Sequence, residues 1–144
     1  MPTTDDDEIR SLLQEVRSVA VLGIKDDPAA DAHRVPAYLR SRGYRILPVN
    51  PGIASTLGEK VVASLGELAE PPDLLNVFRA SRHLPLHLPE ILALSPRPQA
   101  VWLQLGIRDD EFARRLEGVG IRVVQDRCLM VEHARLLPQE PASG

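Results

Sequence analysis

Val19-Ala20-Val21-Leu22-Gly23-Ile24 is a continuous apolar run near the start of the chain. A run of this length and composition is typical of a β-strand that is covered on both faces, as in a parallel sheet. A polar turn, residues 25–30, leads into a helical segment that stops near Arg42, where Gly43 supplies a C-terminal stop. Arg45 to Val49 then forms a second apolar strand. The first 50 residues therefore predict a β-α-β unit.

The same alternation of strands and helices continues along the chain. Pro36 is tolerated only in the first turn of a helix, so we expect its helix to begin near residues 33–35 with Asp31 as the cap. Further strands are predicted at residues 60–63 (a short edge strand), 74–78, 100–106 and 122–125, and further helices at 5–16, 86–94, 109–117 and 129–137. The pattern predicts an α/β fold, a Rossmann-like doubly wound parallel sheet of five to six strands in three α/β/α layers. We expect the tail after Pro138 to fray.

Length and composition predict one compact domain over residues 1–144. Hydrophobic residues make up 44% of the 144 residues, enough for a core that removes roughly two-thirds of the unfolded surface from water. The net charge of -3 lacks the basic excess that nucleic-acid binding requires, so we expect no nucleic-acid partner. The apolar runs are too short for a membrane span, and the acidic residues 5–8 are the reverse of a signal peptide. With Cys128 as the single cysteine, these features favour the cytoplasm.

The loops to inspect for a ligand follow the predicted strands at Ile24, Val49, Phe78 and Leu105, because doubly wound sheets bind ligands at the carboxyl ends of their strands. The first of these loops carries Lys25 and leads to a helix start that carries Arg34. Free backbone N–H groups and the helix dipole make such a helix end a phosphate site, and both cations add positive charge. The alternative, that both side chains are solvated surface residues, stays open at this point.

Two common phosphate-binding motifs are absent from the chain. A nicotinamide dinucleotide site needs G-x-G-x-x-G in the first turn and an acidic residue after the second strand. Gly23 is the only glycine between Val19 and Arg42, and the second strand ends in Asn50-Pro51. No glycine-rich segment ends in Gly-Lys-Ser or Gly-Lys-Thr, so a P-loop is also excluded. A phosphorylated nucleotide would have to be recognised in another way.

Several short motifs together resemble the CoA-binding domain family, the small stand-alone proteins similar to the CoA-binding domain of succinyl-CoA synthetase α subunits. The similarity runs from about Ser18 to Leu137. The most specific pieces are the Pro-Val-Asn-Pro turn and the Trp-Leu-Gln-Leu-Gly strand. The motifs that carry it are Val21-Leu22-Gly23, Arg34-Val35, Gly43-Tyr44-Arg45, Pro48-Val49-Asn50-Pro51, Gly58-Glu59-Lys60, Val77-Phe78-Arg79, Val101-Trp102-Leu103-Gln104-Leu105-Gly106 and Asp126-Arg127-Cys128.

The resemblance implies a Rossmann-like domain that binds coenzyme A or an acyl-CoA across its strand ends. It implies phosphates at the first loop, the adenosine end beside the second strand, and a pantetheine arm that runs past the later strands. Family members usually carry an Ala-Ser pair after the glycine, whereas this chain has Ile24-Lys25. The bulk of Ile24 narrows the turn that would hold the phosphates. The cofactor-binding residues so implied are Gly23, Ile24, Lys25, Arg34, Val49, Asn50, Pro51, Phe78, Arg79, Gln104 and Gly106.

The residues that could carry chemistry favour a protein that is not an enzyme. The chain contains no Gly-x-Ser-x-Gly nucleophile elbow. His83 and His87 have a metal-binding spacing, but Pro85 lies between them, so we expect no metal site. Cys128 is predicted as a small core residue, and Trp102 as part of the core or of a pocket wall.

The sequence therefore favours a non-catalytic carrier, sensor or regulatory protein that binds CoA or acyl-CoA. Three alternatives stay open. The first is the CoA-binding subunit of a multi-chain acyl-CoA ligase. The second is a nicotinamide-nucleotide-binding oxidoreductase, which the missing glycines and acidic residue disfavour. The third is a protein-interaction domain. A protein partner and the oligomeric state cannot be derived from these residues.

Overall fold

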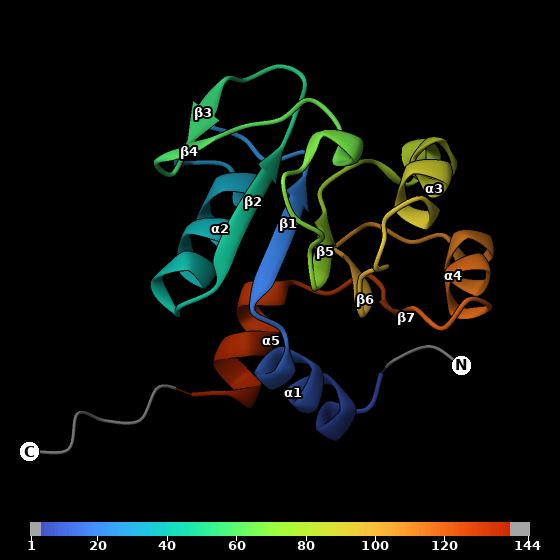
Figure 1. The fold of residues 1–144 in the computed structure, drawn as a ribbon. Helices are drawn as coiled ribbons and strands as arrows, with labels where there is room; N and C mark the ends of the chain where they lie inside the picture. The colour runs from blue at the N-terminus through green and yellow to red at the C-terminus, as the bar shows by residue number, and fades with distance from the viewer. Residues whose placement is uncertain (1–3, 139–144) are drawn as a thin grey trace, which may run out of the picture.

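The computed structural model describes residues 4–138, so the predicted frayed tail after Pro138 lies outside the described residues. Its main sheet has five parallel strands in the order β2-β1-β5-β6-β7 (Figure 1). This arrangement confirms the predicted Rossmann-like α/β fold. The strands are β1 (Ser18–Leu22), β2 (Arg45–Val49), β5 (Leu74–Val77), β6 (Ala100–Leu103) and β7 (Arg122–Val124).

Five α-helices flank this sheet on its two faces. Two apolar clusters define the faces, one under α1, α2 and α5, and the other under α3 and α4. The alternation of side chains in a strand explains the division, since Leu74 belongs to the first cluster and Leu75 to the second. The helices are α1 (Asp6–Glu15), α2 (Asp31–Ser41), α3 (Leu84–Leu92), α4 (Asp110–Glu117) and α5 (Leu129–Leu136), with 3-10 turns η1 (Leu65–Glu67) and η2 (Ser81–His83).

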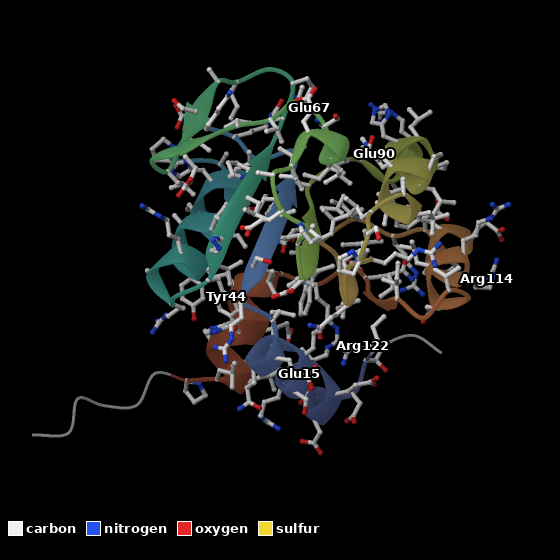
Figure 2. All side chains as sticks on the ribbon, in the orientation of Figure 1. Glu15, Tyr44, Glu67, Glu90, Arg114 and Arg122 are labelled. Atoms are coloured by element: carbon white, nitrogen blue, oxygen red, sulfur yellow. The ribbon has the colours of Figure 1, made fainter. Side chains whose placement is uncertain are left out.

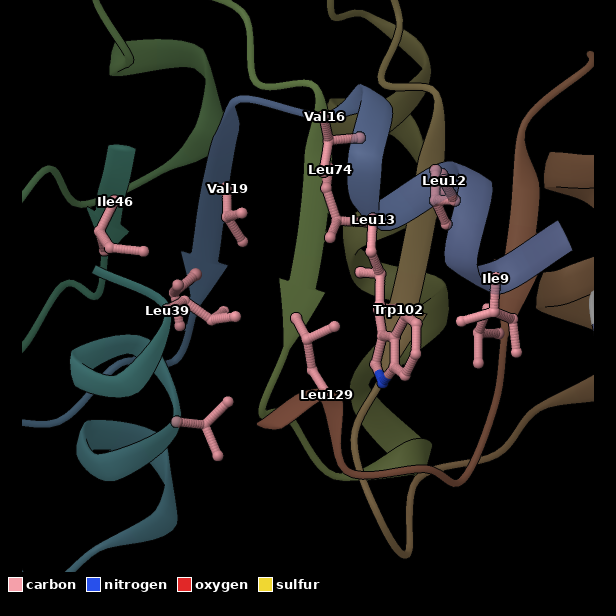
Figure 3. Close-up of a cluster of buried hydrophobic side chains, with 14 of the residues drawn as sticks. Ile9, Leu12, Leu13, Val16, Val19, Leu39, Ile46, Leu74, Trp102 and Leu129 are labelled. Atoms are coloured by element: carbon pink, nitrogen blue, oxygen red, sulfur yellow. The ribbon is translucent and has the colours of Figure 1, made fainter. Parts of the chain in front are cut away.

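Trp102 is the largest side chain of the first cluster and is fully buried. Figure 3 shows its indole among apolar side chains that include Ile9 of α1 and Leu129 of α5. The indole Nε1 donates a hydrogen bond to the carbonyl oxygen of Arg127 at 2.8 Å, which satisfies the only polar atom of the ring. Trp102 is therefore a core residue that also fixes the approach of the chain to α5.

Helix α2 begins two to four residues earlier than predicted, at Asp31, with Ala30 as its N-cap and with Pro36 inside the helix. Proline has no N–H, so the carbonyl of Ala32, four residues before it, loses its usual helical donor. The backbone N–H of Lys25 donates to this carbonyl at 3.2 Å. A donor from the preceding loop thus satisfies the orphaned carbonyl, which is why the helix tolerates proline beyond its first turn.

The predicted edge strand at residues 60–63 is reduced to a single parallel bridge between Val62 and Val49 at the β2 edge of the sheet. The residues before it form a small antiparallel hairpin of β3 (Ser55–Thr56) and β4 (Glu59–Lys60). Leu57 and Gly58 form its two-residue turn, both with positive φ. This is the geometry of a type I′ hairpin turn, and leucine is a rare residue in such a turn.

The remaining differences from the prediction concern element ends. The strands predicted at residues 19–24 and 100–106 end at Leu22 and Leu103, two and three residues earlier than predicted. Helix α3 also starts earlier than predicted, at Leu84, because Pro85 is accepted in its first turn. Asp109 caps α4 as predicted and accepts the Phe112 N–H at 3.0 Å. Over residues 4–138, no helix has the length and apolar character needed to cross a lipid bilayer.

Candidate functional site

The order of the strands places a switch point between β1 and β5. The chain leaves β1 toward β2 on one side and later returns to β5 on the other side. Doubly wound folds bind ligands in a crevice at such a switch point, outside the carboxyl ends of the strands, and the β1-β5 crevice below means the surface between the loops that follow these two strands. The four loops singled out from the sequence all begin at this edge, because all five strands are parallel.

Gly23 brings the β1 loop into close contact with the end of β5. Its φ is +89°, a conformation that residues with a side chain rarely adopt. A Cβ atom at Gly23 would lie 3.1 Å from the carbonyl oxygen of Phe78 and 3.5 Å from the Cδ of Arg79. Glycine is required here for two reasons, the backbone conformation and the close approach of the next strand.

Arg79 contributes an unpaired cationic donor at this place. Its Nε atom is buried, and no hydrogen-bond acceptor for that atom is present within residues 4–138. Leaving a buried donor of a charged group without a partner costs about 1–3 kcal/mol or more. An anionic group in the crevice would recover this free energy, so the switch point is electrostatically prepared for an anion.

Lys25 lies in the β1 loop, and Arg34 lies in the first turn of α2. The Lys25 side chain is exposed, and the Arg34 side chain, 57% exposed, forms an ion pair with Asp31 in the same helix. The backbone N–H groups of Gly23 and Lys25 are not free as the sequence suggested, since they donate to the carbonyls of Val49 and Ala32. The N-cap of α2 makes no side-chain hydrogen bond to the helix, which leaves the helix end as the available phosphate-binding feature.

The β1 loop is held by side chains that sequence reasoning missed. The Nδ1 atom of His33 lies 2.9 Å from the carbonyl oxygen of Lys25. From the β3-β4 hairpin, the buried hydroxyl of Thr56 donates to the carboxylate of Asp26 at 2.8 Å. These contacts fold the hairpin onto the β1 loop. Gly58 was the only sequence signal for the hairpin, and no local pattern indicated its contact with Asp26.

Asn50 connects the loops that follow β1 and β2. Its Nδ2 atom donates to the carbonyl of Ile24 at 2.6 Å, and its Oδ1 atom accepts the N–H of Gly52 at 2.8 Å. The side chains of Ile24 and Val49 are fully buried in the two apolar clusters, so a ligand could meet these two residues only through their backbone. Pro51 is exposed on the rim.

Gln104 and Gly106 hold the β6 loop against the start of α5. The Oε1 atom of the buried Gln104 accepts the N–H of Leu129 at 2.9 Å, which caps α5. Gly106 donates its N–H to the carboxylate of Asp126 at 2.6 Å. Cys128, at the N-cap of α5, is half-buried rather than a fully buried core residue, because it lies at the surface end of this junction.

Phe78 packs partly against the first apolar cluster, whereas Arg79 lies near a group of ionisable side chains on α3. The Nδ1 atom of His87 is buried and has no hydrogen-bond partner within the described residues; it lies 3.7 Å from a carboxylate oxygen of Glu90. Burial lowers the pKa of His87, and the positive charge of Arg79 lowers it further, whereas Glu90 raises it.

A cavity of about 250 Å³ lies at the opposite, amino edge of the sheet beside α5. Tyr44, which is labelled in Figure 2, is one of its lining residues. Arg17 and Arg42 also line it, but α1, α2 and α5 all end there. Helix C-termini carry partial negative charge, so these arginines complement the helices and do not indicate an anion site. His133 is buried there against Tyr38, and burial lowers its pKa.

Comparison with known proteins identifies the family. The model of the CoA binding domain matches residues 17–134, which is most of the chain. The chain belongs to the CoA-binding domain family. The matched region includes all of the loops at the carboxyl edge of the sheet.

Two known proteins are similar to this chain over nearly their whole length. YneT of Bacillus subtilis, an uncharacterized protein, is 39% identical over 127 residues, which cover 88% of this chain and 93% of YneT. A solved structure from Thermus thermophilus, titled cell-free ID.343, is 53% identical with a TM-score of 0.88, and the match covers 93% of this chain and all of that one.

A more distant structure shares the fold alone. The dinucleotide-forming acetyl-coenzyme A synthetase 1 of Candidatus Korarchaeum cryptofilum, solved with phosphate and ADP, is 18% identical with a TM-score of 0.65. The match covers 79% of this chain but only 27% of the synthetase chain. The CoA-binding domain fold therefore also occurs as part of a much larger enzyme chain.

Proposed function

We propose that this protein binds coenzyme A or an acyl-CoA at the carboxyl edge of its sheet, with the phosphates in the crevice between β1 and β5. The single observation that carries the proposal is the buried, unpaired Nε atom of Arg79 beside Gly23 at the switch point. Membership of the CoA-binding domain family supplies the class of ligand. The crevice supplies the reason why that ligand should be anionic.

The cations around the crevice support CoA over a nicotinamide dinucleotide. CoA carries a pyrophosphate and an additional 3′-phosphate, and the edge offers Lys25, Arg34 and Arg79 to these groups. NAD requires a carboxylate after the second strand for its adenosine ribose, and this chain has Asn50 there, whose amide already joins two loops. Charge and loop chemistry thus both favour CoA.

We further propose that the protein binds CoA without catalysing a reaction on it, as a carrier, sensor or regulatory protein in the cytoplasm. The polar side chains of the predicted site that have partners serve to hold loops in place. Asn50 joins the β1 and β2 loops, and Gln104 caps α5. Groups committed to backbone contacts position a ligand and are poorly suited to move protons on it.

Isothermal titration with CoA tests the proposal. Wild-type protein is expected to give saturable binding, whereas the Lys25→Ala, Arg34→Ala double variant is expected to bind about 5- to 150-fold more weakly, equivalent to about 1–3 kcal/mol. The reason is the loss of two charges beside the α2 end. Arg40→Ala on the exposed face of the same helix is the matched control. Absence of wild-type binding would contradict the proposed ligand, and unchanged affinity of the double variant would remove Lys25 and Arg34 from the site.

A further inference from the structure

Arg79, His87 and Glu90 form a group of ionisable side chains whose protonation the proposed function does not use. Two of its polar atoms, Nε of Arg79 and Nδ1 of His87, are buried and unpaired within residues 4–138. Figure 2 shows Glu90 on α3. Its carboxylate lies 3.7 Å from the unpaired nitrogen of His87, within the distance of an ion pair if the imidazole is protonated.

The charges that face His87 come from three elements. Glu90 lies one helical turn away on α3, Arg79 follows β5, and His83 belongs to η2. The N-cap of α4, Asp109, and two charged residues of α4, Glu111 and Arg115, line a groove on the α3 side. On α3 this groove is lined by Pro85, Leu88 and Pro89, a different stripe of the helix from His87. The 3-10 turn η1 also packs against α3, and its charged residue Glu67 accepts a hydrogen bond from the backbone N–H of Ala63. The protonation of His87 is therefore a balance between burial, which opposes the cation together with Arg79 and His83, and Glu90, which favours it.

We propose that binding of an anionic phosphate group at Arg79 is coupled to protonation of His87, so that the site takes up a proton together with its ligand. The inference rests on the proposed function, since CoA supplies the phosphate. In the free protein, burial and Arg79 keep the imidazole neutral. When a phosphate neutralises the guanidinium, the repulsion disappears and a proton from solvent binds at Nδ1, where the imidazolium forms an ion pair with Glu90.

The direction of the pH dependence follows from this coupling. The pKa of His87 in the free protein lies below the ordinary value of 6.5, and the bound phosphate raises it. Because the complex binds the proton more tightly than the free protein does, linkage requires the ligand to bind more tightly as the pH falls through the interval between the two pKa values of His87. The gain in affinity is at most about tenfold per pH unit, because a single proton is taken up.

Calorimetric titration with CoA in buffers of different ionisation enthalpy measures the number of protons taken up. Near pH about 6.5, the ordinary histidine pKa, the wild type is expected to take up more protons than His87→Gln, and its affinity should rise relative to the variant from about pH 8 to about pH 6. The 3′-phosphate of CoA also titrates in this range, but that contribution is common to both proteins. His133→Gln, at the opposite edge of the sheet, is the matched control and should take up as many protons as the wild type.

Nuclear magnetic resonance titration of the His87 imidazole in wild-type protein, with and without CoA, gives the same quantity without a substitution. A higher pKa in the complex is expected. If CoA binds but the proton count and the imidazole pKa are unchanged, the coupling is overturned while the proposed function stands. If CoA does not bind at all, the proposed function fails and the coupling fails with it.

Discussion

Replacement of Gly23 by alanine is expected to lower the free energy of unfolding by about 2–5 kcal/mol. About 1–2 kcal/mol comes from placing a residue with a side chain at positive φ, and about 1–3 kcal/mol from the forced contact with the neighbouring strand. The neighbouring atom is the backbone carbonyl oxygen of Phe78, 3.1 Å from the new Cβ, and backbone cannot rotate away as a side chain can. Because the contact would push the β1 loop away from β5, CoA affinity should fall as well.

Gly43→Ala provides the matched control for this experiment. Gly43 has nearly the same φ, +94°, but apart from its chain neighbours no atom of residues 4–138 lies within 4 Å of a Cβ placed there. It should therefore show only the conformational part of the cost and leave CoA affinity unchanged. Chemical denaturation of both variants, with CoA titrations alongside, makes the comparison. Equal costs for the two substitutions would show that the β1 loop does not press against the backbone of Phe78.

Arg79→Met is expected to weaken CoA binding about 10- to 100-fold while leaving the unliganded protein as stable as the wild type or more stable. The loss in affinity corresponds to about 1.4–2.8 kcal/mol, typical of a charge-assisted hydrogen bond. The gain in stability follows because methionine fills the space of the arginine stem without the buried, unpaired Nε donor. A site that is strained in the absence of its ligand shows this opposition of stability and binding.

Arg82→Met, on the neighbouring 3-10 turn, is the control, since Arg82 is exposed. Thermal unfolding of the free proteins and titration with CoA give the two quantities separately. A strongly destabilised Arg79→Met protein with wild-type affinity would show that Arg79 serves the fold and not the ligand.

The fold was predictable because its strands are short apolar runs with strong local signals. The segment around Val101 and Trp102 and the one around Leu75 are buried on both faces, and such strands leave an unbroken apolar pattern. The start of α2 was not predictable, because the N–H that compensates for Pro36 comes from Lys25, eleven residues earlier in another segment. The hairpin was missed because Leu57 is atypical of its turn.

The candidate site was predictable only as a set of loops. Family resemblance and the carboxyl-edge rule placed Gly23, Asn50 and Gln104 near the ligand, but their backbone contacts depend on the tertiary structure. The unpaired Nε of Arg79 could not be foreseen at all, since whether a donor is buried and unpaired depends on everything packed around it. For the same reason His87 and Glu90 were not expected near the site.

Thermal unfolding in the presence of CoA, acetyl-CoA, NAD and NADP at equal millimolar concentrations tests the ligand assignment most directly. A ligand at about one hundred times its dissociation constant, bound only to the native state, adds about 2.7 kcal/mol. For a domain of this length, that free energy raises the melting temperature by about 5 °C or more. We expect such a rise with both CoA species and little change with NAD or NADP. A larger rise with either nicotinamide cofactor, or no rise with any of the four, would contradict binding of CoA at the β1-β5 crevice.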